Sequence, residues 1–352
     1  MNTVEHLLRR VADVGDDPVE LGRLGREFHD RNRLDHAREL LERATSLDPS
    51  DGRNWVHLAY CYLRSWDPPG GLAVLRRGLE ATDRDPLLLV ALSHFTDDEE
   101  EKARLKGELT GRQEAHARAG LLAHETGGEN PEPALVAMER VAASEPENAP
   151  AWEQVAWSLL GLRRRGAIEG LDLRARGLPI CDRLQALAPD AILPRWLRVQ
   201  MLVGESDWNA VLDATRDALD HFPDDETLMQ LRAQAHARLE DAEAATHWYA
   251  RAIGAKPSFA GARVELGKLY ESRGRLDLAE ALFRELPRAN PSWPLSPISL
   301  AFFLARRGRL EEAEPIFLEG WRRLPEPLRA SVKEHPDLPV LLERDAVRVA
   351  LG

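Results

Sequence analysis

A short phrase recurs in this chain at an interval of 34 residues. RGRLDLAEALF begins at Arg273, RGRLEEAEPIF begins at Arg307, and the related RNRLDHARELL begins at Arg31. A closing proline keeps the same interval, at residues 223, 257, 291 and 325. A period of this length indicates a supersecondary unit that is repeated and stacked, because one such unit cannot bury its own apolar face.

Each unit has the same internal order of small, large and turn-forming residues. Twelve positions before each proline stands a mostly small residue: Val211, Ala245, Ala279 or Ala313. Eight positions before each proline, in the same order, stand Thr215, Tyr249, Phe283 and Phe317. A glycine or polar residue near the middle marks a turn, at Ser206, Glu240, Gly274 and Gly308. The pattern predicts two helices per unit, with the small residue allowing a close helix–helix approach.

This pattern resembles the tetratricopeptide repeat. In residues 260–293 the positions that carry the resemblance are Leu266, Gly267, Tyr270, Gly274, Ala279, Phe283 and Pro291. In residues 18–51 they are Leu24, Gly25, Phe28, Ala37, Leu41, Ala44 and Pro49. The next unit carries Trp55, Leu58, Ala59 and Tyr62. The resemblance implies an all-α fold, a right-handed solenoid of helix hairpins whose first helices line a concave wall.

The period divides the chain into segments. We expect an N-terminal capping helix in residues 1–17, because Val4, Leu7, Leu8 and Val11 share one helical face. Two repeats follow in 18–85, a degenerate helical hairpin in 86–114, and six further repeats in 115–327. The expected bounds of those six are 115–148, 149–191, 192–225, 226–259, 260–293 and 294–327. Residues 328–352 are expected to form a C-terminal capping helix.

One repeat is longer than the others. Between Pro146 and Pro189 the proline interval is 43 residues, and the extra residues fall within the arginine-rich stretch 160–178. Its arginines are Arg163, Arg164, Arg165, Arg174 and Arg176. Two interpretations stay open here: a protruding contact for an acidic partner, or a lengthened hairpin with solvated arginines.

Composition excludes several classes of protein. The formal net charge of −12 argues against a general nucleic-acid or anionic-membrane binder, since phosphate neutralisation needs clustered positive charge. The two cysteines, Cys61 and Cys181, indicate neither a disulfide framework nor a zinc cage. We find no secretory signal and no apolar run long enough to span a membrane, so we expect a cytoplasmic protein.

Catalytic and metal-binding motifs are also missing from the sequence. It has no phosphate-binding glycine loop, no nucleophile elbow and no His-Glu-x-x-His helix. We compared histidine pairs such as His116 with His124 and His236 with His247, and neither has the i, i+4 spacing that places two imidazoles beside one metal. We therefore expect no enzyme activity, no cofactor and no metal.

The resemblance also implies where a partner binds. In this family, certain positions of each first helix face the concave wall, where they bind a protein or peptide. Carried over by register, these positions are Arg23, Arg26, Arg53, His57, Tyr60, Glu153, Trp157, Trp196, Gln200, Gln230, Gln234, Val264, Lys268, Ile298 and Phe302. Aromatic rings separated by amides suit an extended or helical peptide. The alternative is that Trp157 and Trp196 belong to the core within their repeats.

The function that follows is a non-catalytic scaffold or adaptor that holds a protein partner in the groove. Two alternatives stay open: an accessory or chaperone-like subunit of an enzyme or secretion complex, and a peptide-sensing regulator. No motif in the sequence identifies the partner, the pathway or the oligomeric state.

Overall fold

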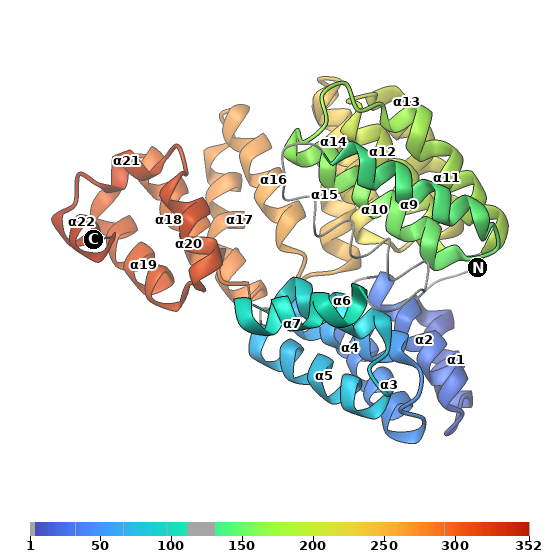
Figure 1. The fold of residues 1–352 in the computed structure, drawn as a ribbon. Helices are drawn as coiled ribbons and strands as arrows, with labels where there is room; N and C mark the ends of the chain where they lie inside the picture. Colours follow the sequence, from blue (N-terminus) through green and yellow to red (C-terminus); the bar gives the residue numbers. More distant parts are fainter. Residues whose placement is uncertain are drawn as a thin grey trace. The chain divides into compact units, whose positions relative to one another are not determined.

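The computed structural model describes residues 4–31, 33–65, 67–96, 98–110, 131–291 and 293–351. These residues form twenty-one helices and contain no strand (Figure 1). The predicted all-α class is therefore confirmed, and so is its organisation as a series of paired helices.

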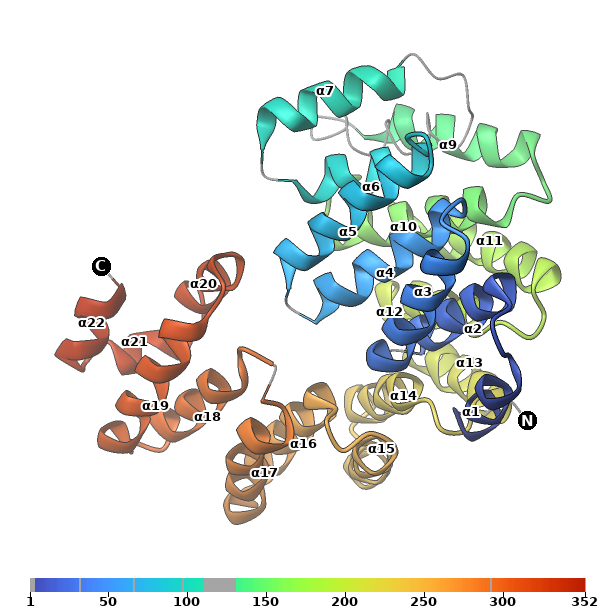
Figure 2. The ribbon, with the colours of Figure 1, turned by 90° about the horizontal axis from the view of Figure 1, so that it is seen from below.

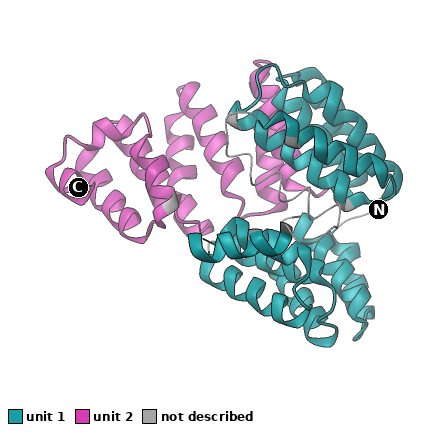
Figure 3. Cartoon of the chain, in the orientation of Figure 1, with its two compact units in different colours: residues 1–223 teal, residues 224–352 magenta. Residues whose placement is uncertain are grey.

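The chain divides into two compact units, residues 1–223 and residues 224–352 (Figure 3). The first unit contains α1 (Val4–Asp13), α2 (Pro18–Asp30), α3 (Leu34–Leu47), α4 (Gly52–Arg64), α5 (Pro68–Ala81), α6 (Pro86–Phe95), α7 (Glu99–Thr110), α9 (Glu132–Ser144), α10 (Ala149–Arg165), α11 (Leu173–Leu187), α12 (Ile192–Gly204) and α13 (Trp208–His221). The second contains α14 (Glu226–Arg238), α15 (Ala242–Ala255), α16 (Ala260–Ser272), α17 (Leu276–Ala289), α18 (Ser296–Arg306), α19 (Leu310–Arg323), α20 (Glu326–Lys333), α21 (Leu338–Leu341) and α22 (Asp345–Leu351).

Neighbouring helices pack as hairpins, and within each unit successive hairpins contact one another, as the pairs α3 with α4 and α15 with α16 show. Helix α2 contacts α3 and α4 contacts α5, while α4 also contacts both α3 and α6 (Figure 2). The same pairing holds in the second unit for α14 with α15, α16 with α17 and α18 with α19. Several first helices also touch the first helix of an adjacent hairpin, as α2 does with α4, α10 with α12 and α14 with α16.

Aspartate residues begin many of the helices. The side chain of Asp17, for example, accepts hydrogen bonds from the backbone N–H groups of Val19 and Glu20. Such a cap satisfies an otherwise unpaired donor and contributes about 1 kcal/mol. The aspartates that cap helices in this way are Asp17, Asp51, Asp67, Asp85, Asp172, Asp207, Asp225 and Asp241.

The turn between the helices of a hairpin uses the residues that the period predicted. Ser206, Glu240, Gly274 and Gly308 all have positive φ, at 57°, 63°, 71° and 71°. An L-residue pays roughly 1–2 kcal/mol to adopt this left-handed conformation, and glycine does not. The glycine in the RGRL phrase is therefore favoured by the backbone of the turn, although Ser206 and Glu240 adopt the same conformation.

The small and large positions of the repeat form its core. Ala245, Ala279 and Ala313 are fully buried, as is Val211. Phe283 is 2% exposed and stacks on Phe303 with ring centroids 4.9 Å apart. A Cβ atom added to Gly267 would lie 2.8 Å from the Phe283 ring. The missing side chain of the glycine on the first helix thus leaves space for the large side chain of the second helix. This contact explains why the two residues recur together.

The described ends of the chain differ in detail from the capping helices that the sequence suggested. In α1, Leu7 is fully buried, but Leu8 is 40% exposed and does not join the core. The tail forms three short helices, α20 to α22, and Pro336 lies in the break between α20 and α21. Its apolar residues still close the last hairpin, since Leu338, Leu341 and Val347 are buried against it.

The nine extra residues of the long repeat lengthen its two helices and the loop between them, and they form no separate domain. Compared with α4, α5 and their loop, α10 is four residues longer, the loop 166–172 is four longer and α11 is one longer. Arg176 pairs with Glu132 and Glu139 at 2.7 and 3.0 Å, and Arg174 pairs with Asp207. These arginines are engaged within the unit, which favours the lengthened-hairpin interpretation.

Of the expected repeat 115–148, the described residues include one helix, α9. Its expected first helix lies outside the described residues. The repeat boundaries from the sequence remain predictions. In the part of the chain that the structure describes, no helix is both long and apolar enough to cross a bilayer.

Candidate functional site

Most predicted groove residues of the first unit fall in two clusters on first helices, and one of these clusters also contains the unpredicted His29 and Asp30. We call the residues Arg26, His29, Asp30, His57 and Tyr60 of α2 and α4 the histidine cluster. We call Glu153, Trp157 and Trp196 of α10 and α12 the tryptophan cluster. Both groups lie within residues 1–223.

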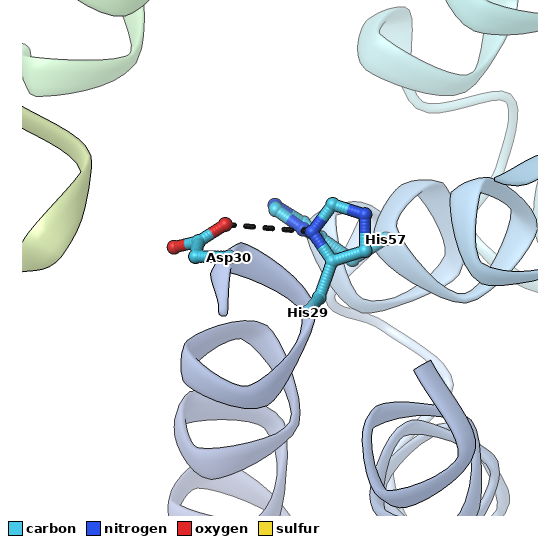
Figure 4. A group of neighbouring side chains, drawn as sticks. All are labelled: His29, Asp30 and His57. Atoms are coloured by element: carbon cyan, nitrogen blue, oxygen red, sulfur yellow. Dashed lines mark hydrogen bonds and ion pairs between the residues drawn. The ribbon is translucent and has the colours of Figure 1, made fainter. Parts of the chain in front are cut away.

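The histidine cluster is built where the last turn of α2 meets α4. His29 is 8% exposed, His57 is half-buried, and their rings meet edge to face with centroids 4.9 Å apart. Their Nδ1 atoms lie 3.3 Å apart. The Nδ1 atom of His29 also lies 3.4 Å from a carboxylate oxygen of the exposed Asp30 (Figure 4).

Burial sets the protonation of His57. It lowers the pKa of His57 to about 3, and the adjacent His29 acts in the same direction. The His57 imidazole is therefore neutral at neutral pH, with one nitrogen lone pair available. Tyr60 closes one side of the cluster, with its ring 6.2 Å from that of His29 and 5.5 Å from that of Phe95.

The two predicted arginines of this region are held by neighbouring side chains. Arg26 donates a hydrogen bond to the buried Asn54 and lies 3.6 Å from Asp51. Arg53 is exposed and pairs with the same Asp51 at 3.1 Å. Asp51 thus connects both guanidinium groups to the start of α4.

The tryptophan cluster presents aromatic surface to solvent. Trp157 is 44% exposed and Trp196 is half-buried, and their ring centroids lie 5.2 Å apart with the planes tilted by 41°. Trp157 is one of the few large apolar side chains that the described residues leave exposed. It is not core, so the core interpretation does not hold for this residue.

Glu153 lies one helical turn before Trp157 on α10, on the same face of the helix. Burial raises the pKa of its carboxyl to about 7, and the Asp30 carboxylate acts in the same direction. Among the described residues we find no hydrogen bond or ion pair to the Glu153 side chain. A half-buried carboxylate one turn from an exposed indole ring, with no counter-charge among the described residues, is an unusual arrangement, since buried charges are normally paired.

The remaining predicted positions are dispersed. Gln200 is half-buried one turn after Trp196 on α12. In the second unit, Gln230 packs against Gly261, Gln234 is half-buried, and Lys268 is exposed and pairs with Glu265 at 2.9 Å. Phe302 is 4% exposed and stacks on His335 at 4.0 Å, so it belongs to the core of its repeat. It offers no exposed anchor, and we do not include it in the site.

Sequence reasoning did not find His29 or Asp30. It compared histidines only at the i, i+4 spacing of a single helix, whereas His29 and His57 come from the first helices of consecutive repeats. The signal available was the repeat period itself, because α2 and α4 lie in contact.

Comparison with known proteins agrees with the repeat pattern. The tetratricopeptide-repeat family profile matches residues 23–86 and 231–294. A search of curated protein sequences finds no match to the chain.

Solved structures of repeat proteins are similar to the chain at low sequence identity. Yeast Tom70 is 11% identical, with a TM-score of 0.42 over 96% of this chain and 90% of that one. Human IFIT1, solved as a dimer with m7Gppp-AAAA, is 16% identical, with a TM-score of 0.44 over 84% of this chain and 76% of that one. MamA is 16% identical, with a TM-score of 0.36 over 49% of this chain and 95% of that one.

Proposed function

The chain belongs to the tetratricopeptide-repeat family, and on that premise we propose that it is a non-catalytic scaffold that holds a segment of a partner protein against the tryptophan cluster. The observation that carries this proposal is the exposed Trp157 ring beside Trp196, one helical turn from the Glu153 carboxylate, to which the described residues bring no counter-charge.

The chemistry of the cluster defines the segment. Exposed indole rings bind apolar side chains, and their faces attract cations. Glu153 has no positive partner among the described residues and is already partly desolvated. A lysine or arginine of the segment would therefore form an ion pair with its carboxylate. The partner segment therefore carries a basic residue next to a large apolar one.

Two features favour binding over catalysis. The tryptophan cluster offers no nucleophile and no general base paired with one, which acyl or phosphoryl transfer requires. Its aromatic rings come from consecutive first helices, α10 and α12, which gives an extended segment a row of contacts.

A selection from a defined peptide library tests the proposal. The full chain is immobilised and probed with random 15-residue peptides displayed on phage, in parallel with Trp157→Ala and Glu153→Gln. We expect the wild type to enrich a consensus with a basic residue beside an apolar one. Loss of an aromatic anchor typically costs 2 kcal/mol or more, roughly thirtyfold in affinity, so Trp157→Ala should lose that consensus.

Trp248→Ala is the matched control. Trp248 lies on the second helix α15, where Arg232 and Arg251 stack over its ring. This variant should select the same peptides as the wild type. A wild type that enriches no consensus, or a consensus that survives in Trp157→Ala, contradicts the proposal.

A further inference from the structure

The histidine cluster contains donor atoms that no part of the proposed function uses. His29 and Asp30 are consecutive residues at the end of α2, and His57 lies in the middle of α4. Within the described residues this is the group of histidine, cysteine and acidic side chains whose donor atoms all lie within 4.8 Å of one another.

The spacing of these donors fits a small metal ion. Zinc binds imidazole nitrogen at about 2.0–2.1 Å and carboxylate oxygen at about 2.0–2.2 Å. In a tetrahedron of that size, neighbouring donor atoms lie roughly 3.3–3.5 Å apart. The distance between the two Nδ1 atoms is 3.3 Å, and that from His29 Nδ1 to Asp30 Oδ1 is 3.4 Å. The donor atoms of His57 and Asp30 lie within 4.8 Å of each other, and rotation of the exposed Asp30 carboxylate would shorten this distance.

The surroundings are compatible with metal binding at both Nδ1 atoms. Coordination there places the remaining proton of each imidazole on Nε2. For His29 this is the nitrogen 3.5 Å from Arg64 Nη1, and Arg64 also lies 3.4 Å from the His29 carbonyl oxygen. When His29 Nε2 carries the proton it no longer accepts from Arg64, but the His29 carbonyl oxygen remains as an acceptor for this guanidinium. The nearby Arg26 guanidinium lies 3.6 Å from the Asp51 carboxylate, which it shares with Arg53.

The donor set indicates the class of ion. Two imidazoles and one carboxylate suit a borderline divalent transition metal, whereas magnesium and calcium prefer oxygen ligands. Three protein ligands leave a further coordination position for water. Asp30 is exposed, so the ion has a route from solvent.

We propose that His29, Asp30 and His57 form a binding site for one divalent transition-metal ion of the zinc type. The ion would join the last turn of α2 to α4 and so connect the first two repeats. This inference departs from the expectation of no metal that the sequence suggested, and none of the three proposed ligands belongs to the tryptophan cluster.

Cobalt(II) titration of the full chain, after treatment with a chelator, tests this site. The visible absorption of Co²⁺ reports its coordination, and Zn²⁺ is then used to displace it. We expect one equivalent of Co²⁺ to bind and one equivalent of Zn²⁺ to replace it. Losing a group that only supports a ligand costs about 10–100-fold in affinity, so losing a ligand in His57→Gln should weaken binding by about 100-fold or more. Asp30→Asn should weaken it by at least about tenfold.

His247→Ala is the control for adventitious binding by surface histidines. His247 is exposed on α15, so this variant should bind Co²⁺ as the wild type does. Circular dichroism checks that each variant folds. If His57→Gln does not fold, the exposed Asp30→Asn variant and X-ray absorption at the zinc edge of the wild type decide the question. Absence of a one-equivalent site, binding that persists in the cluster variants, or fewer than two imidazole ligands at zinc overturns the inference.

Discussion

The indole rings of Trp157 and Trp196 lie 5.2 Å apart, although the two residues belong to consecutive repeats. Because both occupy first helices, the repeat period places them on the same face of the array. Their position in the sequence and their exposure in the structure together define the surface that we propose as the binding site.

Stability measurements separate an exposed anchor from a core residue. Trp157 is 44% exposed, so Trp157→Ala should lower the free energy of unfolding by less than about 1 kcal/mol. Trp321 is 6% exposed and its indole N–H donates to the carbonyl of Ala350 at 3.1 Å. Trp321→Ala should therefore cost about 3–5 kcal/mol. Denaturant melts of both variants check the difference, and equal losses would place Trp157 in the core.

Two substitutions in the hairpin turns should change the stability of the chain in opposite directions. Glu240 has a φ of 63° and is exposed, so Glu240→Gly should relieve the left-handed strain and stabilise the chain by about 0.5–1 kcal/mol. Gly274→Ala should destabilise by about 1 kcal/mol, because a Cβ there meets no atom within 4 Å and only the backbone conformation resists it. Thermal unfolding that shifts in the same direction for both variants would contradict this account of the turns.

The repeat core could be predicted from sequence because its determinants are local. Gly267, Ala279 and Phe283 lie within one repeat, and their spacing alone sets which of them touch. The turn at Glu240 was found in the same way, since the period marks it even without glycine.

Contacts between repeats and at the ends were harder to predict. His29 on α2 contacts His57 on α4, the first helix of the next hairpin, and no pattern within a single helix relates the two residues. Phe302 fits the register of a concave position, yet the tail supplies His335 to cover it. Because a capping segment has no repeat period, its contacts do not follow from the register.

The Glu153 carboxyl should make stability and binding respond to pH in opposite directions. Its pKa in the folded chain is raised to about 7, above the value near 4.5 of an exposed glutamate. The folded state therefore holds this proton more tightly, and that contribution to stability is lost as the pH rises from about 4.5 to about 7. A basic peptide requires the ionised form, so its affinity should rise over pH 6–8.

Glu153→Gln should therefore be more stable than the wild type at pH 8, on the order of 1 kcal/mol, while binding the selected peptide more weakly. Its affinity should also lose the pH dependence. Thermal melts and peptide titrations at pH 6 and pH 8 check this, and a variant that is destabilised at pH 8 would refute the assignment of an unpaired carboxylate.

The two cysteines should be inert in the folded chain. Cys61 and Cys181 are each 1% exposed, and burial raises the pKa of both thiols to about 12. The reactive thiolate is therefore scarce at neutral pH. A thiol-specific disulfide reagent should label neither cysteine quickly in the native protein and both after denaturation. Rapid native labelling would show that one of these helices opens readily.

The most direct test of the account is a double-mutant cycle between Glu153 and the basic residue of the peptide selected from the library. Affinities are measured for the wild type and Glu153→Gln, each with the peptide and with a peptide whose basic residue is replaced by norleucine. If the basic side chain sits on Glu153, the two changes should be coupled by about 1–3 kcal/mol, since interacting charges in contact show energies of this size. Effects that add to within about 0.5 kcal/mol would show that the segment does not bind against this carboxylate, and would contradict the proposed binding site.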